Sequence, residues 1–182
     1  KESPSVYQKG VTLIELLVTI AILAIILALG VPSFREMLVR NQASSIVTEF
    51  ANDVSRVRTE AISRNSCVSI CMSTNTANAL TGATPTCATS GADWQSGWII
   101  FSNPTCSTTI NNPTTSGNTL IKVRQAGVNT FTLISNATVR RFTYESRGLP
   151  FNGQSNFTLA YTPETVASPH YRSVCVSSAG RV

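Results

Sequence analysis

An α+β fold is predicted for this chain, with one long N-terminal helix followed by an antiparallel β-sheet domain. Two observations predict it. Up to about residue 65 the apolar residues recur with helical spacing, and beyond that point short β-prone runs alternate with turn-forming residues. The length of 182 residues suits one domain of ordinary size with an appendage.

The composition excludes a disordered chain. Apolar residues make up 42% of the sequence and charged residues 13%, against about 25% charged residues in an average soluble protein. The net charge of +5 arises from 14 Lys and Arg against 9 Asp and Glu. A charge of that size does not by itself indicate nucleic-acid binding.

The most apolar segment covers residues 11–31 and contains a single charged residue, Glu15. As a helix it is about 31 Å long, which matches the hydrocarbon thickness of a bilayer. We therefore expect a transmembrane helix at 11–31. Residues 1–10 before it carry Lys1 and Lys9, so we expect that end to stay in the cytoplasm and the rest of the chain to be extracytoplasmic.

A cleaved secretory signal is the alternative, because it shares the basic start and the apolar run. The run is longer than the roughly 7–15 apolar residues of such a signal, and no A-x-A-like site follows it. The pattern also continues directly into an amphipathic helix. We therefore expect the apolar segment to be retained.

Residues 32–65 are expected to continue the helix as an amphipathic segment. Apolar residues recur at alternating steps of three and four, which is the spacing of one helix face. They are Val47, Phe50, Val54, Val57 and Ala61, flanked by Ile46 and Ile62. The other faces are expected to carry Arg40, Glu49, Asp53, Arg56, Arg58 and Glu60. Pro32 has no amide hydrogen, so a kink or an unwound turn is expected near it.

Residues 66–182 are expected to form the sheet domain on which the amphipathic helix packs. The β-prone runs are 67–72, 98–101, 120–124, 130–134, 139–144, 157–161 and 172–177. Residues 73–96 and 102–118 are polar and rich in Thr, Asn and Ser, so we expect surface loops there.

Glu15 needs an explanation, because a carboxylate in the apolar phase of a membrane costs about 2.5–3.5 kcal/mol. A side chain near the end of the span could reach the interface, which is the structural alternative to a functional role. An ionisable residue inside a membrane segment is nevertheless a functional candidate by default, and we treat Glu15 as one.

The residues around Glu15 carry a resemblance. Gly10, preceded by Lys9 and followed by the hexapeptide VTLIEL, resembles the processing signature of type IV pilin-like proteins. The resemblance implies cleavage by a prepilin peptidase after Gly10, so that residues 1–10 form a leader peptide, and methylation of the new amino group on Val11. It also implies storage in the bacterial inner membrane and then assembly with other major and minor pilin subunits into a pilus or pseudopilus.

The same resemblance gives Glu15 a role in assembly. Cleavage creates an ammonium group on Val11, and in a filament the Glu15 carboxylate of one subunit could pair with that ammonium of a neighbour. In apolar surroundings the two charges attract strongly, because neither is hydrated. A misplaced subunit would leave both unpaired, so we expect Glu15 to set the register of the filament.

Motifs beyond the apolar segment narrow the resemblance to the FimT and FimU minor pilins and the GspH pseudopilins. They are residues 31–35, 53–64, Cys71 with Trp94, 97–101 and 178–182. The likeness implies a type IV pilin-like fold and a minor subunit at or near the filament tip that helps to start pilus assembly, in some members with DNA binding in natural transformation. A pseudopilin of a type II secretion system, or a tip adhesin that uses the long Thr/Asn-rich loops, remains an alternative.

Five cysteines in an extracytoplasmic domain are disulfide candidates. Cys71 and Cys87 bracket a polar loop as in the resembling family, which implies a disulfide between them. Cys67, Cys106 and Cys175 stay open, and one of the five must be free or pair between chains. A metal site has little support, because no C-x-x-C occurs and His170 is the only histidine.

The sheet domain has seven basic residues and three acidic ones, and this positive balance can attract the phosphates of DNA. In DNA-binding members of the family a Gly-Arg element near the C-terminus carries the contact, and Gly180 with Arg181 matches it. The further candidates are Arg172, Arg140, Arg141 and Arg147. The alternative is that scattered arginines only solubilise a charge-poor surface.

No enzyme is predicted. Any catalytic triad or Cys-His pair would have to use His170, which we expect at the surface, and no nucleophile or nucleotide-binding motif occurs. No cofactor is expected. Trp94 and Trp98 could stack on bases, but we expect core positions for both, with Trp98 beginning a strand and Trp94 covering its edge.

Overall fold

The computed structural model describes residues 10–115, 117–136, 139–151, 153–162 and 169–182. Residues 1–9, which belong to the expected leader, lie outside the described part. The chain divides into two compact units, Lys1–Arg40 and Asn41–Val182.

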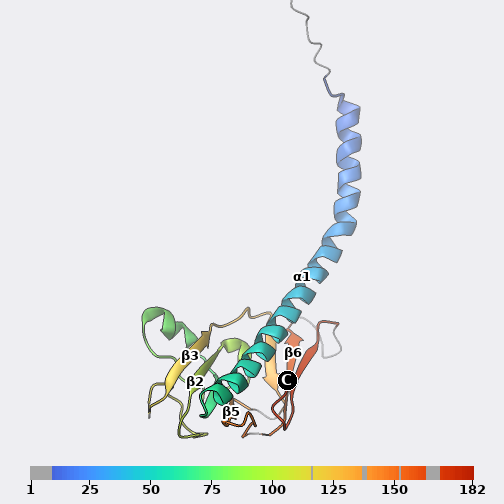
Figure 1. The fold of residues 1–182 in the computed structure, drawn as a ribbon. Helices are drawn as coiled ribbons and strands as arrows, with labels where there is room; N and C mark the ends of the chain where they lie inside the picture. The colour runs from blue at the N-terminus through green and yellow to red at the C-terminus, as the bar shows by residue number, and fades with distance from the viewer. Residues whose placement is uncertain (1–9, 116, 137–138, 152, 163–168) are drawn as a thin grey trace, which may run out of the picture. The chain divides into compact units, whose positions relative to one another are not determined.

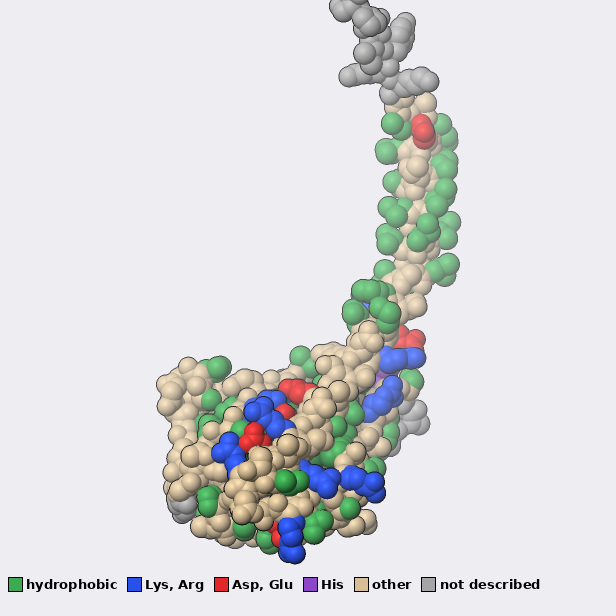
Figure 2. Space-filling model, viewed as in Figure 1, with side chains coloured by type: hydrophobic (Ala, Val, Ile, Leu, Met, Phe, Trp, Pro, Cys, Tyr) green, Lys and Arg blue, Asp and Glu red, His purple; other side chains and the backbone are tan. Residues whose placement is uncertain are grey.

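One helix, α1, spans Leu13–Ser63 (Figure 1). In the first unit its apolar side chains are exposed on all sides (Figure 2), and none of the residues in its most apolar window is buried. By length and composition it is the one helix of the described residues that could cross a membrane. The helix is continuous through Pro32, so the unwound turn that the proline allowed does not form.

In the second unit α1 presents one buried face, made of Ala43, Ile46, Phe50, Asp53, Val54, Val57 and Ala61. The expected stripe is therefore confirmed in its centre and shifted at its ends, because Ile62 is half exposed. Asp53 was expected on a polar face, and this expectation is wrong: the residue is buried, with 4% of its surface exposed.

The end of α1 explains why the helical pattern stops where it does. Asn65 has a positive φ of 47°, and its N–H donates to the carbonyl of Ile62, while the N–H of Ser66 donates to the carbonyl of Ala61. These two bonds form a Schellman cap, which satisfies the last helix carbonyls and turns the chain into the first strand.

Seven strands follow in the described residues, and each overlaps one of the expected β-prone runs. They are β1 Val68–Met72, β2 Trp98–Ser102, β3 Thr119–Arg124, β4 Phe131–Ser135, β5 Arg141–Tyr144, β6 Ser155–Tyr161 and β7 Arg172–Val176. All observed pairings are antiparallel. The segment expected as the loop 73–96 also contains two short 3-10 helices, η1 Thr76–Thr81 and η2 Trp94–Ser96.

The expected sheet is divided into two. One has the order β3-β2-β1-β5 and the other β4-β6-β7. The division arises because β5 pairs with β1 rather than with β4, the strand before it in the chain. An isolated bridge between Asp93 and Ile134 connects β4 to the segment that leads into β2.

The core lies where α1 covers both sheets. The Phe50 ring of α1 lies 5.3 Å from Trp94, 5.4 Å from Trp98 and 4.7 Å from Phe157, measured between ring centroids. Trp98 begins β2, Trp94 lies in η2 and Phe157 lies in β6, so one side chain of the helix contacts both sheets. Edge-to-face aromatic contacts of this kind are worth about 0.5–1.5 kcal/mol each beyond their buried area.

Two disulfides fasten the long polar segments to β1. Cys71 is bonded to Cys87, the pair that the family resemblance implied, and Cys67 to Cys106. In the chain-entropy treatment, loops of 16 and 39 residues correspond to about 3 and 4 kcal/mol of stabilisation. Both segments are thereby held against the four-stranded sheet.

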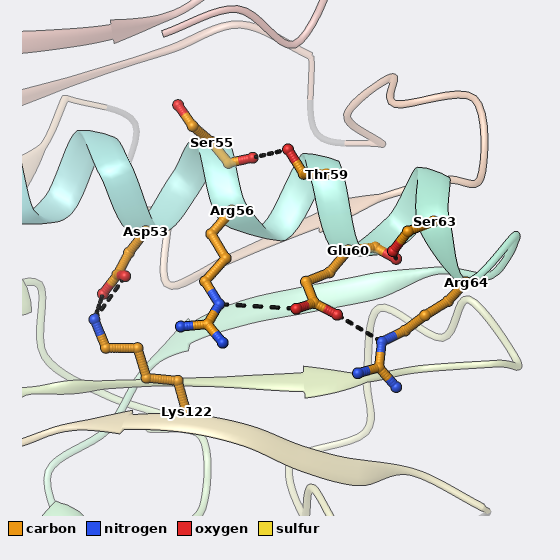
Figure 3. A network of polar contacts seen from close by, with 8 residues as sticks. All are labelled: Asp53, Ser55, Arg56, Thr59, Glu60, Ser63, Arg64 and Lys122. Atoms are coloured by element: carbon orange, nitrogen blue, oxygen red, sulfur yellow. Dashed lines mark hydrogen bonds and ion pairs between the residues drawn. The ribbon is translucent and has the colours of Figure 1, made fainter.

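A buried charged pair joins α1 to the four-stranded sheet. Lys122 of β3 reaches the Asp53 carboxylate (Figure 3), with Nζ 2.7 Å from Oδ1 and 2.8 Å from Oδ2. The indole N–H of Trp98 donates to Oδ2 at 2.8 Å. The buried carboxylate therefore has partners on two neighbouring strands, as a buried charge requires.

We predict that Asp53→Ala lowers the free energy of unfolding by about 2–3 kcal/mol, because it leaves the Lys122 ammonium and the Trp98 N–H without an acceptor. Lys122 remains about one-third exposed, which keeps the loss below that of a fully buried pair. Urea unfolding followed by tryptophan fluorescence measures it. Glu36→Ala, which removes an exposed pair with Arg40, is the control and should change stability by less than about 0.5 kcal/mol. Equal stability of the two variants would contradict the prediction.

Candidate functional site

The residues of the expected processing site are accessible. Gly10 precedes the helix, and a Cβ built on it would meet no atom within 4 Å. Val11 is 73% exposed. The bond between these two residues therefore lies in a non-helical, open stretch of chain, the conformation in which a peptidase can bind its substrate.

Glu15 lies in the first turn of α1. The Thr12 hydroxyl accepts a hydrogen bond from the Glu15 N–H at 3.3 Å, so Thr12 is the N-cap and Glu15 the third helical residue. Thr-x-x-Glu is the sequence pattern of a capping box, and an acidic residue in the first turn also suits the helix dipole. Sequence reasoning missed this local role, although the spacing of the two residues could have shown it.

Arg140 and Arg141, two of the five arginines proposed to bind DNA, hold loop segments of their own domain. Arg140 Nε donates to the Gly91 carbonyl at 2.6 Å. Arg141 donates to the Thr108 carbonyl and, at 2.8 Å, to Asn111 Oδ1, and burial lowers the pKa of its guanidinium. These contacts fix the two polar segments in place.

Arg172 and Arg147 differ in what their guanidinium groups contact. Arg172 Nη1 donates to the carbonyls of Pro169 and Tyr171, both at 2.8 Å. Arg147 is 79% exposed and makes one long contact, 3.4 Å, with Glu145. Figure 2 shows the basic side chains of the second unit in separate groups rather than in one continuous track.

Arg181 lies beside Arg58, a residue that sequence reasoning assigned only to a polar helix face. Both line a surface pocket of about 470 Å³ between α1 and the last residues of the chain. The remaining lining residues are Ser55, Thr59, Ile62, Gly180 and Val182. Sequence spacing could not have found this pair, because the two arginines are brought together only by the fold.

The C-terminal turn that carries Arg181 is held from three sides. Arg58 Nη1 and the Tyr144 hydroxyl both donate to the Gly180 carbonyl, each at 3.4 Å. The Ser177 N–H donates to the Arg181 carbonyl at 2.8 Å. Burial raises the pKa of Tyr144 to about 12, with an opposing effect of the Arg58 charge, so the phenol is neutral at physiological pH.

Trp94 and Trp98 are both fully buried, which confirms core positions for them. Trp94 Nε1 donates to the Val139 carbonyl at 3.0 Å, and the Arg124 guanidinium lies 4.4 Å from the Trp98 ring centroid. Neither ring face is open to a nucleic-acid base.

His170 is not at the surface, contrary to expectation. It is 4% exposed, and its ring lies 5.7 Å from that of Tyr161. Among the described residues, no three His, Cys, Asp or Glu side chains come together as a metal-binding group.

Cys175 is the free cysteine of the described chain and is exposed on β7, at the edge of the three-stranded sheet. Its Sγ lies 3.6 Å from Asn156 Oδ1. The other four cysteines are paired, and Cys67 and Cys106, whose partners the sequence left open, are bonded to each other.

Comparison with known proteins adds to this picture. Residues 47–180 match the model of a family described as type II transport protein GspH, and residues 6–31 match the prokaryotic N-terminal methylation motif. No protein of curated function matches the chain significantly.

Two crystal structures of the type IV minor pilin FimU of Pseudomonas aeruginosa strain PAO1 share the fold. One, in space group P21, has a TM-score of 0.54 at 19% identity and covers 78% of this chain and 87% of FimU. The other, in space group P65, has a TM-score of 0.52 at 18% identity and covers 76% and 88%.

We predict that Gly180→Ala lowers the free energy of unfolding by about 1–3 kcal/mol and displaces the turn that carries Arg181. Gly180 has a φ of 73°, and an added Cβ would lie 2.5 Å from the Gly148 oxygen. Gly82→Ala is the matched control, because Gly82 has a φ of 79° with nothing within 4 Å. Urea unfolding should show the larger loss for Gly180→Ala, and equal losses would mean that the close approach contributes nothing.

Proposed function

Because the chain belongs to the GspH family of minor pilins and pseudopilins, we propose that it is a filament subunit that acts by assembly and not by catalytic turnover. The observation that carries the proposal is the start of the chain's apolar helix: an open Gly10–Val11 bond, a Thr12 cap and Glu15, followed by an exposed apolar surface. A helix with apolar side chains on every face needs lipid or other apolar helices around it.

In this proposal a prepilin peptidase cleaves after Gly10, which removes residues 1–10 as a leader, and the new amino group on Val11 is methylated. The match of residues 6–31 to the N-terminal methylation motif supports both steps. The segment 11–31 then holds the subunit in the inner membrane as a single span, with the amphipathic part of the helix, 32–65, and the sheet domain, 66–182, outside the cytoplasm. Two disulfides in the sheet domain suit an oxidising compartment.

Glu15 is proposed to guide assembly with other major and minor pilin subunits. After cleavage its carboxylate pairs with the Val11 ammonium of a neighbouring subunit, and an unpaired charge in the apolar bundle opposes any other register. We place the subunit at or near the tip of a type IV pilus, where it helps to start assembly. The fold shared with the type IV minor pilin FimU supports a role in a type IV pilus. A pseudopilin of a type II secretion system is the alternative, and the GspH family description favours it.

DNA binding is a second candidate function, supported by the exposure of Arg147 and Arg181. Arg140, Arg141 and Arg172 hold carbonyl oxygens or side chains of their own domain, so using them for phosphate contacts would cost internal hydrogen bonds. An adhesin role of the Thr/Asn-rich segments has no comparable support from the geometry.

We predict that Glu15→Leu gives a subunit that is processed and membrane-inserted but absent from filaments, because the charge pair that sets register is lost. Mass spectrometry of membranes and of sheared filaments measures processing and incorporation. Gly10→Leu is the contrasting variant, which should retain residues 1–10 and never leave the membrane. Recovery of Glu15→Leu in filaments at the wild-type level would contradict the role of Glu15.

For DNA we predict a salt-sensitive association of the full chain in detergent with a duplex oligonucleotide, because phosphate contacts release counterions. Arg181→Ala should weaken DNA binding. Arg172→Ala should leave DNA binding unchanged, because the Arg172 guanidinium donates to backbone carbonyls and contacts no phosphate. Fluorescence anisotropy at low and moderate salt measures both. Absence of binding at low salt would eliminate the DNA candidate and leave the assembly role unaffected.

A further inference from the structure

The pocket lined by Arg58 and Arg181, here called the arginine pocket, contains two guanidinium groups. Both of its charged side chains are arginines, and none of its lining side chains is acidic. Within the described chain neither arginine makes an ion pair. Arg58 has one long hydrogen bond, to the Gly180 carbonyl, and its buried Nε has no partner among the described residues.

The acidic side chains near the pocket, Glu60 and Glu145, pair with arginines outside it. Glu60 of α1 pairs with both Arg56 and Arg64 (Figure 3). Its Oε1 lies 3.8 Å from Arg56 Nε, and its Oε2 lies 2.7 Å from Arg64 Nε. Glu145 pairs with Arg147. The Tyr144 hydroxyl donates to the Gly180 carbonyl and so is a neutral neighbour. Two guanidinium groups in one pocket, with their local carboxylates engaged elsewhere, favour an anionic group from outside the chain.

The lining of the pocket also contains two exposed apolar side chains. Ile62 and Val182 are 50% and 44% exposed. The turn between β5 and β6 carries two more exposed apolar residues, Leu149 and Phe151. This turn touches the pocket, because a Cβ on Gly148 would lie 2.8 Å from the Ile62 side chain and 3.0 Å from Arg58 Nε. Exposed apolar side chains around arginines are typical of the centre of a protein interface.

We propose that the arginine pocket is a docking site for a partner protein that presents a carboxylate beside an aliphatic side chain. The two guanidiniums bind the carboxylate, and the apolar rim covers the aliphatic group. A nucleic-acid backbone would use the charge but would leave the aliphatic rim uncovered, so the rim favours a protein. The inference rests on the proposed assembly role, in which this chain contacts other subunits.

The test uses the full chain in detergent with its arginines labelled with ¹⁵N, so that NMR follows the Nε–H signals. The probes are the peptide N-acetyl-Leu-Glu-Leu-amide, its Leu-Gln-Leu counterpart, inorganic phosphate and a single-stranded oligonucleotide. We expect the Glu peptide to shift the Arg58 and Arg181 signals saturably, and the uncharged Gln peptide to bind at least about tenfold more weakly.

Arg181→Met and Arg58→Met should each weaken binding of the Glu peptide by about tenfold. Arg64→Met is the matched control, since Arg64 directly follows α1 and pairs with Glu60 outside the pocket, and it should bind as the wild type. Arg58→Met also removes the contact with Gly180, so Arg181→Met, whose guanidinium has no internal hydrogen bond in the described chain, decides the result if Arg58→Met unfolds.

Three outcomes would overturn the proposal: no shift with the Glu peptide, equal binding of the Glu and Gln peptides, or tighter binding of phosphate or the oligonucleotide at the same two signals. The last outcome would make the pocket a phosphate site. Failure of the assembly role is detected separately, by absence of the wild-type chain from filaments. A chain that enters filaments but does not bind the Glu peptide would refute the pocket alone.

Discussion

The fold of the second unit depends on one buried carboxylate. Asp53 faces the four-stranded sheet from α1 and accepts hydrogen bonds from Trp98 of β2 and Lys122 of β3. A shift of the helix by one residue would rotate this side chain by about 100°, away from both donors and against apolar side chains. The same rotation would take Phe50 out of its contacts with Trp94 and Trp98. Asp53 and Phe50 together therefore fix the register between helix and sheet.

A second carboxylate connects the two sheets. Asp93 Oδ1 accepts hydrogen bonds from the backbone N–H of Gln95 in η2 and from that of Leu133 in β4. The short helix η2 thereby places Trp94 against Phe50 and Phe157, at the point where α1 covers both sheets. Asp53 and Asp93 together explain how a chain with few charges specifies one packing arrangement: each of the two carboxylates is matched to donors on separate segments.

The parts of the structure that follow from local patterns could be predicted from the sequence. Each of the seven strands in the described residues was predicted, because a strand is signalled by β-branched and aromatic residues that are neighbours in the chain. The helical spacing of Phe50 and Val54 also placed both residues in the core. Burial of Asp53 could not be predicted, since its partner Lys122 lies 69 residues away. For the same reason the pairing of Cys67 with Cys106, the burial of His170 and the meeting of Arg58 with Arg181 required the folded chain. Gly10 and Glu15 could be proposed from the sequence, because their signal lies within a few consecutive residues.

The two disulfides have a consequence for how such a subunit can diverge. The loop closed by Cys71 and Cys87 lies inside the larger loop closed by Cys67 and Cys106, so the rings are nested and both are anchored at β1. The outer ring also contains β1, η2 and β2, which belong to the core, whereas no residue of 77–84 in the inner ring is buried. Lengthening or replacing residues 77–84 would leave the hydrophobic interior and the helix contact unchanged. Subunits built on one core could therefore acquire different outer surfaces by mutation within the inner ring.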